Sequence, residues 1–312
     1  MSPTDDADLG FLEALVGDGR PLLLLTGLSL ILAGLFALFL AATGHFLPHD
    51  VQYLGMDARR LCEVQGCRIV HFMFHDRVAF GGAIIAVGIL YLWLAAFPIR
   101  AGQAWAWWLF AMSGSAGFAS FLAYLGTGYL DTWHGVATLG LLALFLGGLA
   151  RTFRLLAPPR SWRTILKAGA PVGAGCALLL ATAGGMIAGG ATILAVGMTS
   201  VFVPTDLQYM GVKVEELHAL NPRLVPLIAH DRAGFGGGIL TCGLLVLGCV
   251  WCATPSKALW QALAAAGSLG FGCALGVHFM VGYTDVLHLL PAVAGTGLFL
   301  LGLAFFRRAA GI

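Results

Sequence analysis

Apolar residues fall in long runs along the chain, and short segments between the runs carry most of the charged and proline residues. Each run is about twenty residues long, the length that an α-helix needs to cross the ~30 Å hydrocarbon core of a bilayer. The pattern therefore predicts an all-α polytopic membrane protein with about eight transmembrane helices. Their ranges are roughly 21–45, 76–97, 104–126, 131–150, 170–201, 231–253, 259–281 and 286–306.

Composition supports this interpretation, because 59% of the 312 residues are hydrophobic and only 10% are charged. Soluble globular domains carry much more charge than this, so soluble enzymes are excluded. The formal net charge of +2 gives no basis for binding nucleic acid. The lipid bilayer is the predicted partner of the chain.

The distribution of Lys and Arg predicts the orientation of the helices in the membrane. Eight spans place both termini and the loops 98–103, 151–167 and 254–258 on one side, which we predict to be cytoplasmic. The basic residues on that side are Arg20, Arg100, Arg151, Arg154, Arg160, Arg163, Lys167, Lys257, Arg307 and Arg308. The two long loops, at about 46–75 and 202–230, are then extracytoplasmic, and a bacterial-type inner membrane is the expected location.

The second half of the chain repeats motifs of the first half in the same order. The matches are offset by 156 (206 − 50), 155 (231 − 76) and 154 (285 − 131) residues. They pair 48–55 (PHDVQYLG) with 204–211 (PTDLQYMG), 75–82 (HDRVAFGG) with 230–237 (HDRAGFGG), and 128–134 (GYLDTWH) with 282–288 (GYTDVLH).

This duplication predicts two four-helix repeats that insert in the same orientation, related by a pseudo-twofold axis along the membrane normal. Repeat 1 spans 21–150 and repeat 2 spans 168–308. A basic cytoplasmic linker at 151–167 joins them, and 1–20 is a cytoplasmic tail. The tail is acidic and lacks the positive start of a cleaved signal peptide, so we expect the first span to be retained.

Every shared motif lies at the outer end of a span or in an outer loop, so the topology brings its polar residues to the extracytoplasmic face. The candidate cluster of repeat 1 is Asp50, Gln52, Tyr53, Arg68, His75, Asp76, Arg77, Tyr129, Asp131 and His134. That of repeat 2 is Asp206, Gln208, Tyr209, Arg223, His230, Asp231, Arg232, Tyr283, Asp285 and His288. Span interiors hold almost no ionisable groups, with His278 as the main exception, so an ion path through the middle of the membrane is not expected.

Histidines and carboxylates that converge in this way are ligands for zinc and related metals. In repeat 1, His75 opens the second span, while Asp131 and His134 share one face at the start of the fourth. His71 lies one turn before His75, whereas its counterpart in repeat 2 is Pro226. The predicted metal ligands are therefore His71, His75, Asp131 and His134, and His75 with His134 are alternatively axial ligands of a haem.

A structural interpretation competes with the metal site. Neighbouring Asp and Arg side chains tie loops to helices through ion pairs, and aspartates near helix N-termini act as caps. The same cluster then anchors the outer loops without any ligand, and a third interpretation is a pocket for an anionic or quinone-like ligand.

Three functions remain open at this point. The first is a metal- or haem-binding membrane oxidoreductase or its subunit. The second is a lipid or small-molecule transporter in which Arg68, Arg77, Arg223 and Arg232 meet an anionic head group. The third is a non-catalytic membrane subunit or assembly factor whose outer loops dock a membrane-complex partner.

The chain has seven cysteines, and five of them fall in predicted spans, where they are most simply small apolar packing residues. Only Cys62 and Cys67 lie in a predicted outer loop. They can close a short disulfide if that compartment is oxidising.

Overall fold

A computed structural model describes residues 10, 16–129, 132–167, 173–309 and 311. Within these residues the secondary structure is entirely helical, and eight helices are long and apolar enough to cross a membrane. The predicted helical class and the eight candidate spans are thus confirmed. The spans are α2 (Arg20–Ala42), α5 (Arg68–Leu94, continued by η2, Ala95–Ile99), α6 (Ala104–Ser120, followed by α7, Ala123–Thr127), α8 (Thr132–Thr152), α10 (Ala174–Met198), α13 (Leu224–Cys252), α14 (Lys257–Val281) and α15 (Val286–Ala309).

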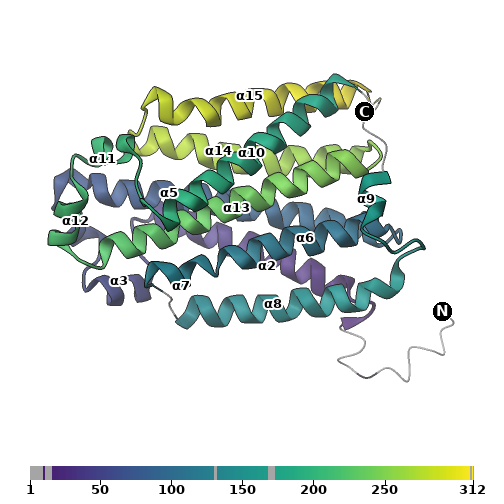
Figure 1. The fold of residues 1–312 in the computed structure, drawn as a ribbon, viewed down its shortest axis with the longest axis horizontal. Coiled ribbons are helices and arrows are strands. Elements are labelled where there is room, and N and C mark those ends of the chain that lie inside the picture. Colours follow the sequence, from purple (N-terminus) through teal and green to yellow (C-terminus); the bar gives the residue numbers. More distant parts are fainter. Residues whose placement is uncertain (1–9, 11–15, 130–131, 168–172, 310, 312) are drawn as a thin grey trace.

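Helices α5 and α13 form the centre of the bundle (Figure 1). Their most apolar segments are 72% and 61% buried, whereas no other span exceeds 39%. Helix α5 packs against α2, α13 and α14, and α13 also packs against α6 and α10. Helices α8 and α15 lie outside these, with α8 against α2 and α15 against α10.

The peripheral helices expose large apolar side chains over their outward faces. Because water would penalise so much exposed apolar surface, the environment that suits this bundle is the lipid bilayer. Examples on α2, α8, α14 and α15 are Leu32, Phe39, Leu139, Met280 and Leu300, each at least half exposed.

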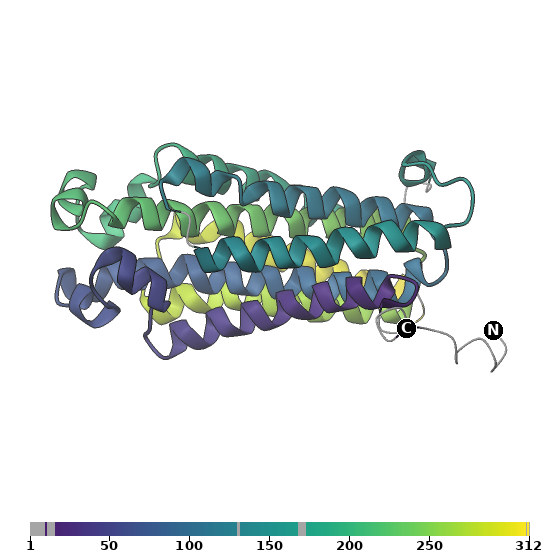
Figure 2. The same cartoon turned by 90° about the horizontal axis from the view of Figure 1, so that it is seen from below.

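The two long outer loops form a separate layer at one end of the bundle (Figures 1 and 2). This layer contains α3 (Pro48–Leu54), α4 (Ala58–Cys62), η1 (Gln65–Cys67), α11 (Pro204–Met210) and α12 (Val214–Leu220), while η3 (Phe153–Leu155) and α9 (Arg163–Lys167) lie toward the opposite end. Helix α5 has 27 residues, about 40 Å at 1.5 Å per residue, so it exceeds the membrane core and projects into the layer. Its Phe72 and Met73 pack there with Leu217 and Leu227 in a second hydrophobic core.

The matched outer-loop segments fold in the same way in both halves. Each begins with a proline, whose fixed φ suits the first turn of a helix, and each ends at a glycine in the left-handed conformation. These glycines are Gly55 (φ 70°) and Gly211 (φ 69°). Each helix places an aspartate in its first turn, Asp50 in α3 and Asp206 in α11, and both aspartates are buried.

Cys62 and Cys67 form a disulfide in the outer layer, which is the pairing that the sequence left dependent on an oxidising compartment. The other five cysteines are free, and Cys176, Cys242 and Cys249 are buried. Their burial among apolar side chains agrees with a packing role.

Gly190 of α10 and Gly236 of α13 bring these two helices into backbone contact. A Cβ atom at Gly190 would lie 2.4 Å from the backbone nitrogen of Leu240, whereas one at the neighbouring Gly189 would meet nothing within 4 Å. We expect Gly190→Ala to lower the free energy of unfolding by about 1–3 kcal/mol, because a helix backbone must move to admit the methyl group. Gly189→Ala should leave stability unchanged or raise it by up to about 1 kcal/mol through better helix propensity. Unfolding of both variants in detergent tests this, and equal destabilisation would contradict the close approach.

Candidate metal centre

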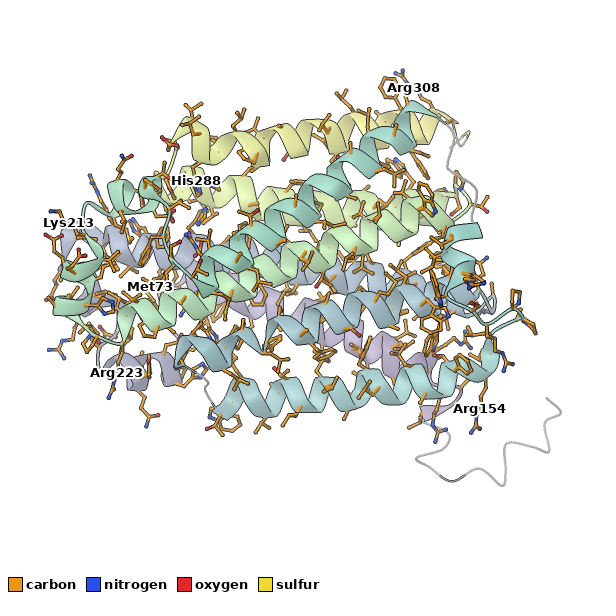
Figure 3. All side chains as sticks on the ribbon, viewed as in Figure 1. Met73, Arg154, Lys213, Arg223, His288 and Arg308 are labelled. Carbon is orange, nitrogen blue, oxygen red and sulfur yellow. A yellow bond between two sulfur atoms is a disulfide. The ribbon has the colours of Figure 1, made fainter. Side chains whose placement is uncertain are left out.

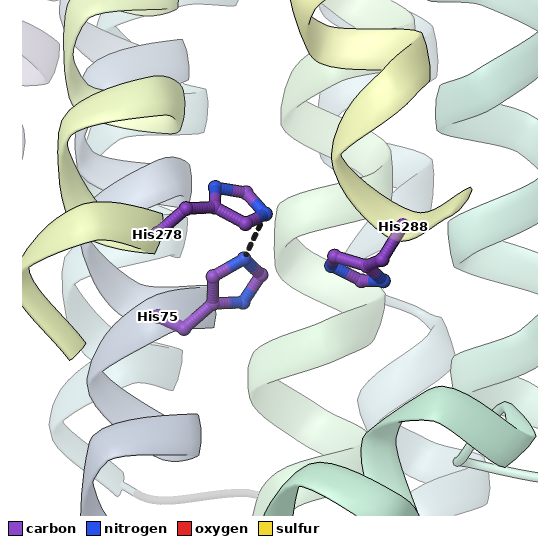
Figure 4. Close-up of side chains that lie close together, drawn as sticks. All are labelled: His75, His278 and His288. Carbon is purple, nitrogen blue, oxygen red and sulfur yellow. Dashed lines mark hydrogen bonds between the residues drawn. The ribbon is translucent and has the colours of Figure 1, made fainter. Parts of the chain in front are cut away.

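Three histidines from three helices meet where the bundle joins the outer layer (Figure 4). They are His75 of α5, His278 of α14 and His288 of α15. One nitrogen of each ring lies within 4.8 Å of the others, and the Nε2 atoms of His75 and His278 are 3.0 Å apart. His75 and His278 are buried, and His288 is half-buried. Among the described residues, this is the group of side chains that can offer three ligand atoms to one metal ion.

The Nδ1 atom of each ring has its own hydrogen-bond partner outside the group. The partners are the Asp76 carboxylate for His75 (2.9 Å), the Ala274 carbonyl for His278, and the Tyr283 hydroxyl for His288 (3.1 Å). Metal-binding histidines characteristically hold their second nitrogen in this manner, which fixes the ring and its tautomer. Nε2 is the nitrogen left on each ring for a ligand at the centre.

These partners also assign the protons. The Ala274 carbonyl can only accept, so Nδ1 of His278 donates and Nε2 of the neutral ring carries a lone pair. The Asp76 carboxylate accepts from Nδ1 of His75, and Nε2 of that ring faces Nε2 of His278. The two Nε2 atoms lie 3.0 Å apart, within hydrogen-bond distance (Figure 4), so one proton shared between them satisfies the pair when no metal is bound, and a metal ion between them would replace that proton. A tetrahedral metal with nitrogen ligands at its usual bond length holds them about 3.3 Å apart, so the spacing suits a metal.

Arg232 supports this site from α13. It pairs with Asp76 (3.1 Å) and with Asp206 in a close ion pair, and its guanidinium lies 4.8 Å from the centre of the Phe72 ring. Arg232 also donates to the carbonyl of Val201 (3.1 Å), a β-branched residue held at φ 65°, where such residues are rarely found. Since each buried charge has a partner of opposite sign, the carboxylate that orients His75 is itself held in place.

A second cluster repeats these contacts with the matching residues. Arg77 pairs with Asp50 (2.9 Å) and with Asp231 (2.7 Å). The Tyr129 hydroxyl donates to Asp50 (2.6 Å), as the Tyr283 hydroxyl donates to Asp206 (2.8 Å). Each arginine therefore binds one aspartate from its own half of the chain and one from the other half.

The two clusters differ at the position of His278. The ring of His230, which matches His75, stacks on Tyr124 with the ring centres 3.7 Å apart. Tyr124 stands five residues before Tyr129, as His278 stands five residues before Tyr283. This equal spacing is the sequence signal that could have assigned His278 to the site. From the sequence alone, His278 was noted only as an ionisable residue within a span.

Electrostatics keep Asp50 charged and Tyr283 neutral. Burial is the largest influence on Asp50 and acts to raise its pKa, but the charge of Arg77 and the hydrogen bond from Tyr129 outweigh it, so the pKa lies below the ordinary 3.8. Stabilisation from Asp50 is therefore present at neutral pH and is lost as the pH falls through this lowered pKa. Burial raises the pKa of Tyr283, so Tyr283 remains a hydroxyl donor to Asp206.

The structure does not bring the predicted metal ligands together at one site. His75 belongs to the three-histidine group, but His71 and His134 do not. His134 lies in the second cluster, with its ring centre 5.3 Å from that of His230. The reason is helix packing, because α5 packs against α14, whereas α8 packs against α2 and α6. Asp131 lies outside the described residues.

Several other members of the predicted clusters lie at the surface. Asp285 caps the start of α15 by accepting from the backbone nitrogen of His288 (2.9 Å), and Arg223 donates to the carbonyl of Tyr53 (2.6 Å). Tyr53 and Tyr209 are half-buried and stack on Tyr129 and Tyr283. The exposed members are Gln52, Arg68, Gln208, Arg223 and Asp285.

The eight apolar helices and the buried histidine group indicate a multi-pass membrane protein with a site able to hold a metal ion. Comparisons of the chain with protein families, with curated proteins and with solved structures found no match.

Proposed function

We propose that this chain is a membrane metalloenzyme of the oxidoreductase class, with the metal held by His75, His278 and His288. The observation that carries the proposal is the convergence of three imidazoles whose Nδ1 atoms are all occupied elsewhere. Three protein ligands leave further coordination positions for water or substrate, as catalytic metal sites require.

The ligand set favours copper, zinc or iron over magnesium or calcium, because imidazole nitrogens suit these transition metals and oxygen ligands suit the harder ions. Haem is disfavoured between His75 and His278, because 3.0 Å between their nitrogens leaves no room for a porphyrin and its iron. A single metal ion is the better fit.

Redox chemistry is favoured over hydrolysis by the state of the nearby carboxylates. Asp76 is bound by His75 and Arg232, and Asp206 is bound by Arg232 and Tyr283. Neither carboxylate is left to act as a general base on a metal-bound water. A redox-active copper or iron ion needs no such base.

The contacts of the arginines weigh against the transporter alternative. Arg77 and Arg232 are each paired with two carboxylates, so neither has a free charge for an anionic head group. Their ion pairs do tie α3 and α11 to the central helices, as the anchoring interpretation expects. Anchoring and metal binding are compatible, because Asp76 takes part in both.

We further infer that 21–150 and 168–308 are parallel repeats, related by a pseudo-twofold axis along the membrane normal and joined by the linker 151–167. The supporting observation is that matched residues make matched contacts, with Arg77 bridging Asp50 and Asp231 as Arg232 bridges Asp206 and Asp76. Each cluster draws on both halves of the chain.

Orientation follows from the basic residues in this proposal. Arg154 and Arg308 lie at the end of the bundle opposite the outer layer (Figure 3). The positive-inside rule makes that end cytoplasmic in a bacterial-type inner membrane. The histidine site then faces the extracytoplasmic side, where the Cys62–Cys67 disulfide is also stable.

Elemental mass spectrometry on the detergent-purified protein tests the metal site, with paramagnetic resonance to detect copper or iron. We expect near-stoichiometric metal that is lost in His75→Ala and retained in His134→Ala, the matched control in the second cluster. Resonance of a redox-active ion that changes on reduction supports the oxidoreductase class. A folded wild-type protein that binds none of these metals after reconstitution would overturn the proposal.

A further inference from the structure

An apolar chamber of about 90 Å³ lies next to the histidine site, on the side of the membrane interior. Ala79, which lines it, is one turn after His75 on α5. Ala274, also in the lining, supplies the carbonyl that accepts from His278. Phe235 completes this end of the chamber, with its ring centre 6.4 Å from that of His75. The chamber thus begins where the metal site ends.

The chamber extends along the helices as a slot. Its lining on α5 runs from Ala79 through Ala83 and Ala86 to Leu90, a spacing that follows one helix face. The eleven steps from Ala79 to Leu90 (90 − 79) correspond to about 16 Å of helix. This length is close to half of the ~30 Å hydrocarbon core, the depth that one leaflet of lipid chains occupies.

The lining contains no charged side chain. Its one thiol, that of Cys242, donates to the carbonyl of Ala83 (3.1 Å). Water in a buried cavity needs two to four polar partners, and this wall offers none that is free among the side chains. Many wall positions are alanine or glycine, so the space is left by small residues along a packed interface. A hydrocarbon chain matches both the chemistry and the length of the slot.

We propose that the chamber binds the hydrocarbon chain of a lipid-class substrate, whose oxygen-bearing head group lies at the three-histidine site. This inference rests on the proposed metal site, because the metal provides the partner for the head group. Arg232 is already paired with Asp76 and Asp206, so the head group is recognised by coordination rather than by a free cation. The substrate reaches the site from the membrane, with its chain in the slot and its reactive end among the imidazoles.

Photocrosslinking of the zinc-loaded, full-length protein tests the proposal, with hexadecanol that carries a diazirine in mid-chain as the probe. We expect labelled peptides from the chamber-facing parts of α5, α13 and α14. Ala83→Phe on α5 and Ala266→Phe on α14 fill the slot from two different helices and should each lower this labelling at least fivefold, with zinc content unchanged. Ala143→Phe, at an exposed position on α8, is the matched control and should label like the wild type.

Zinc content separates the two proposals. A protein that binds zinc but is labelled only on lipid-facing helices, or equally in the filled variants, would overturn the chamber inference and leave the metal site standing. A wild-type protein that binds none of zinc, copper or iron after reconstitution would overturn the metal site and, with it, the assignment of a lipid-class substrate to that site. Using two filling variants ensures that a folding defect in one does not decide the outcome.

Discussion

Replacing His278 by tyrosine is expected to lower the affinity for Zn²⁺ at least about 100-fold, equivalent to about 2.7 kcal/mol. The substitution removes one of the three proposed ligands and installs the residue found at the matching position, Tyr124. Loss of a supporting partner alone commonly costs 10–100-fold in metal affinity, so loss of a ligand costs more. Zinc titration by calorimetry on metal-free protein in detergent measures the change.

The reciprocal variant provides the control. Tyr124→His places a histidine against His230, close to His134, and should add a second, weaker zinc equivalent, whereas Tyr124→Phe should leave the wild-type stoichiometry. If His278→Tyr binds zinc as tightly as the wild type, the three-histidine group is not the metal site.

Arg232→Met is expected to lower the free energy of unfolding by about 3–5 kcal/mol, because it leaves Asp76 and Asp206 buried without their cation. Arg232→Lys keeps the charge but loses the planar fork that reaches both carboxylates, so an intermediate loss is expected. Denaturant unfolding in mixed micelles gives the values.

Exposed Arg60 serves as the comparison for this variant. Arg60→Met should change stability by no more than about 0.5 kcal/mol, as surface substitutions generally do. A loss for Arg232→Met no greater than that of Arg60→Met would show that the two carboxylates do not depend on Arg232.

The eight long helices could be predicted from hydropathy, because a bilayer imposes a minimum length of apolar chain on each span. The start of α5 could not be predicted in this way. The predicted span began at residue 76, whereas the helix begins at Arg68. The intervening turns carry His71 and His75, and α5 continues through them because the outer layer packs around its projecting end. Hydropathy detects where lipid contact begins and does not detect where a helix begins.

The gathering of polar residues at one end of the bundle could also be predicted from the sequence, because an alternating topology fixes which span ends share a face. The contact partners of these residues could not be predicted. Pairing His75 with His278 depends on the packing of α5 against α14, and the pattern of apolar residues carries no information about which spans are neighbours. For the same reason, the sequence could not show that Asp76 pairs with Arg232 and Asp231 with Arg77, because each motif already contains both an aspartate and an arginine.

This pairing across the two halves has an evolutionary consequence. Under the proposed duplication, an unfused four-helix unit could complete its Asp–Arg–Asp bridge only by pairing with a second copy, and a symmetric homodimer would carry two identical sites. Joining the copies in one polypeptide removes that constraint, since each position can then mutate without its twin. On this proposal, histidine at 278 and tyrosine at 124 are such a divergence, in which one site has a third imidazole and the other has a tyrosine at the matching position.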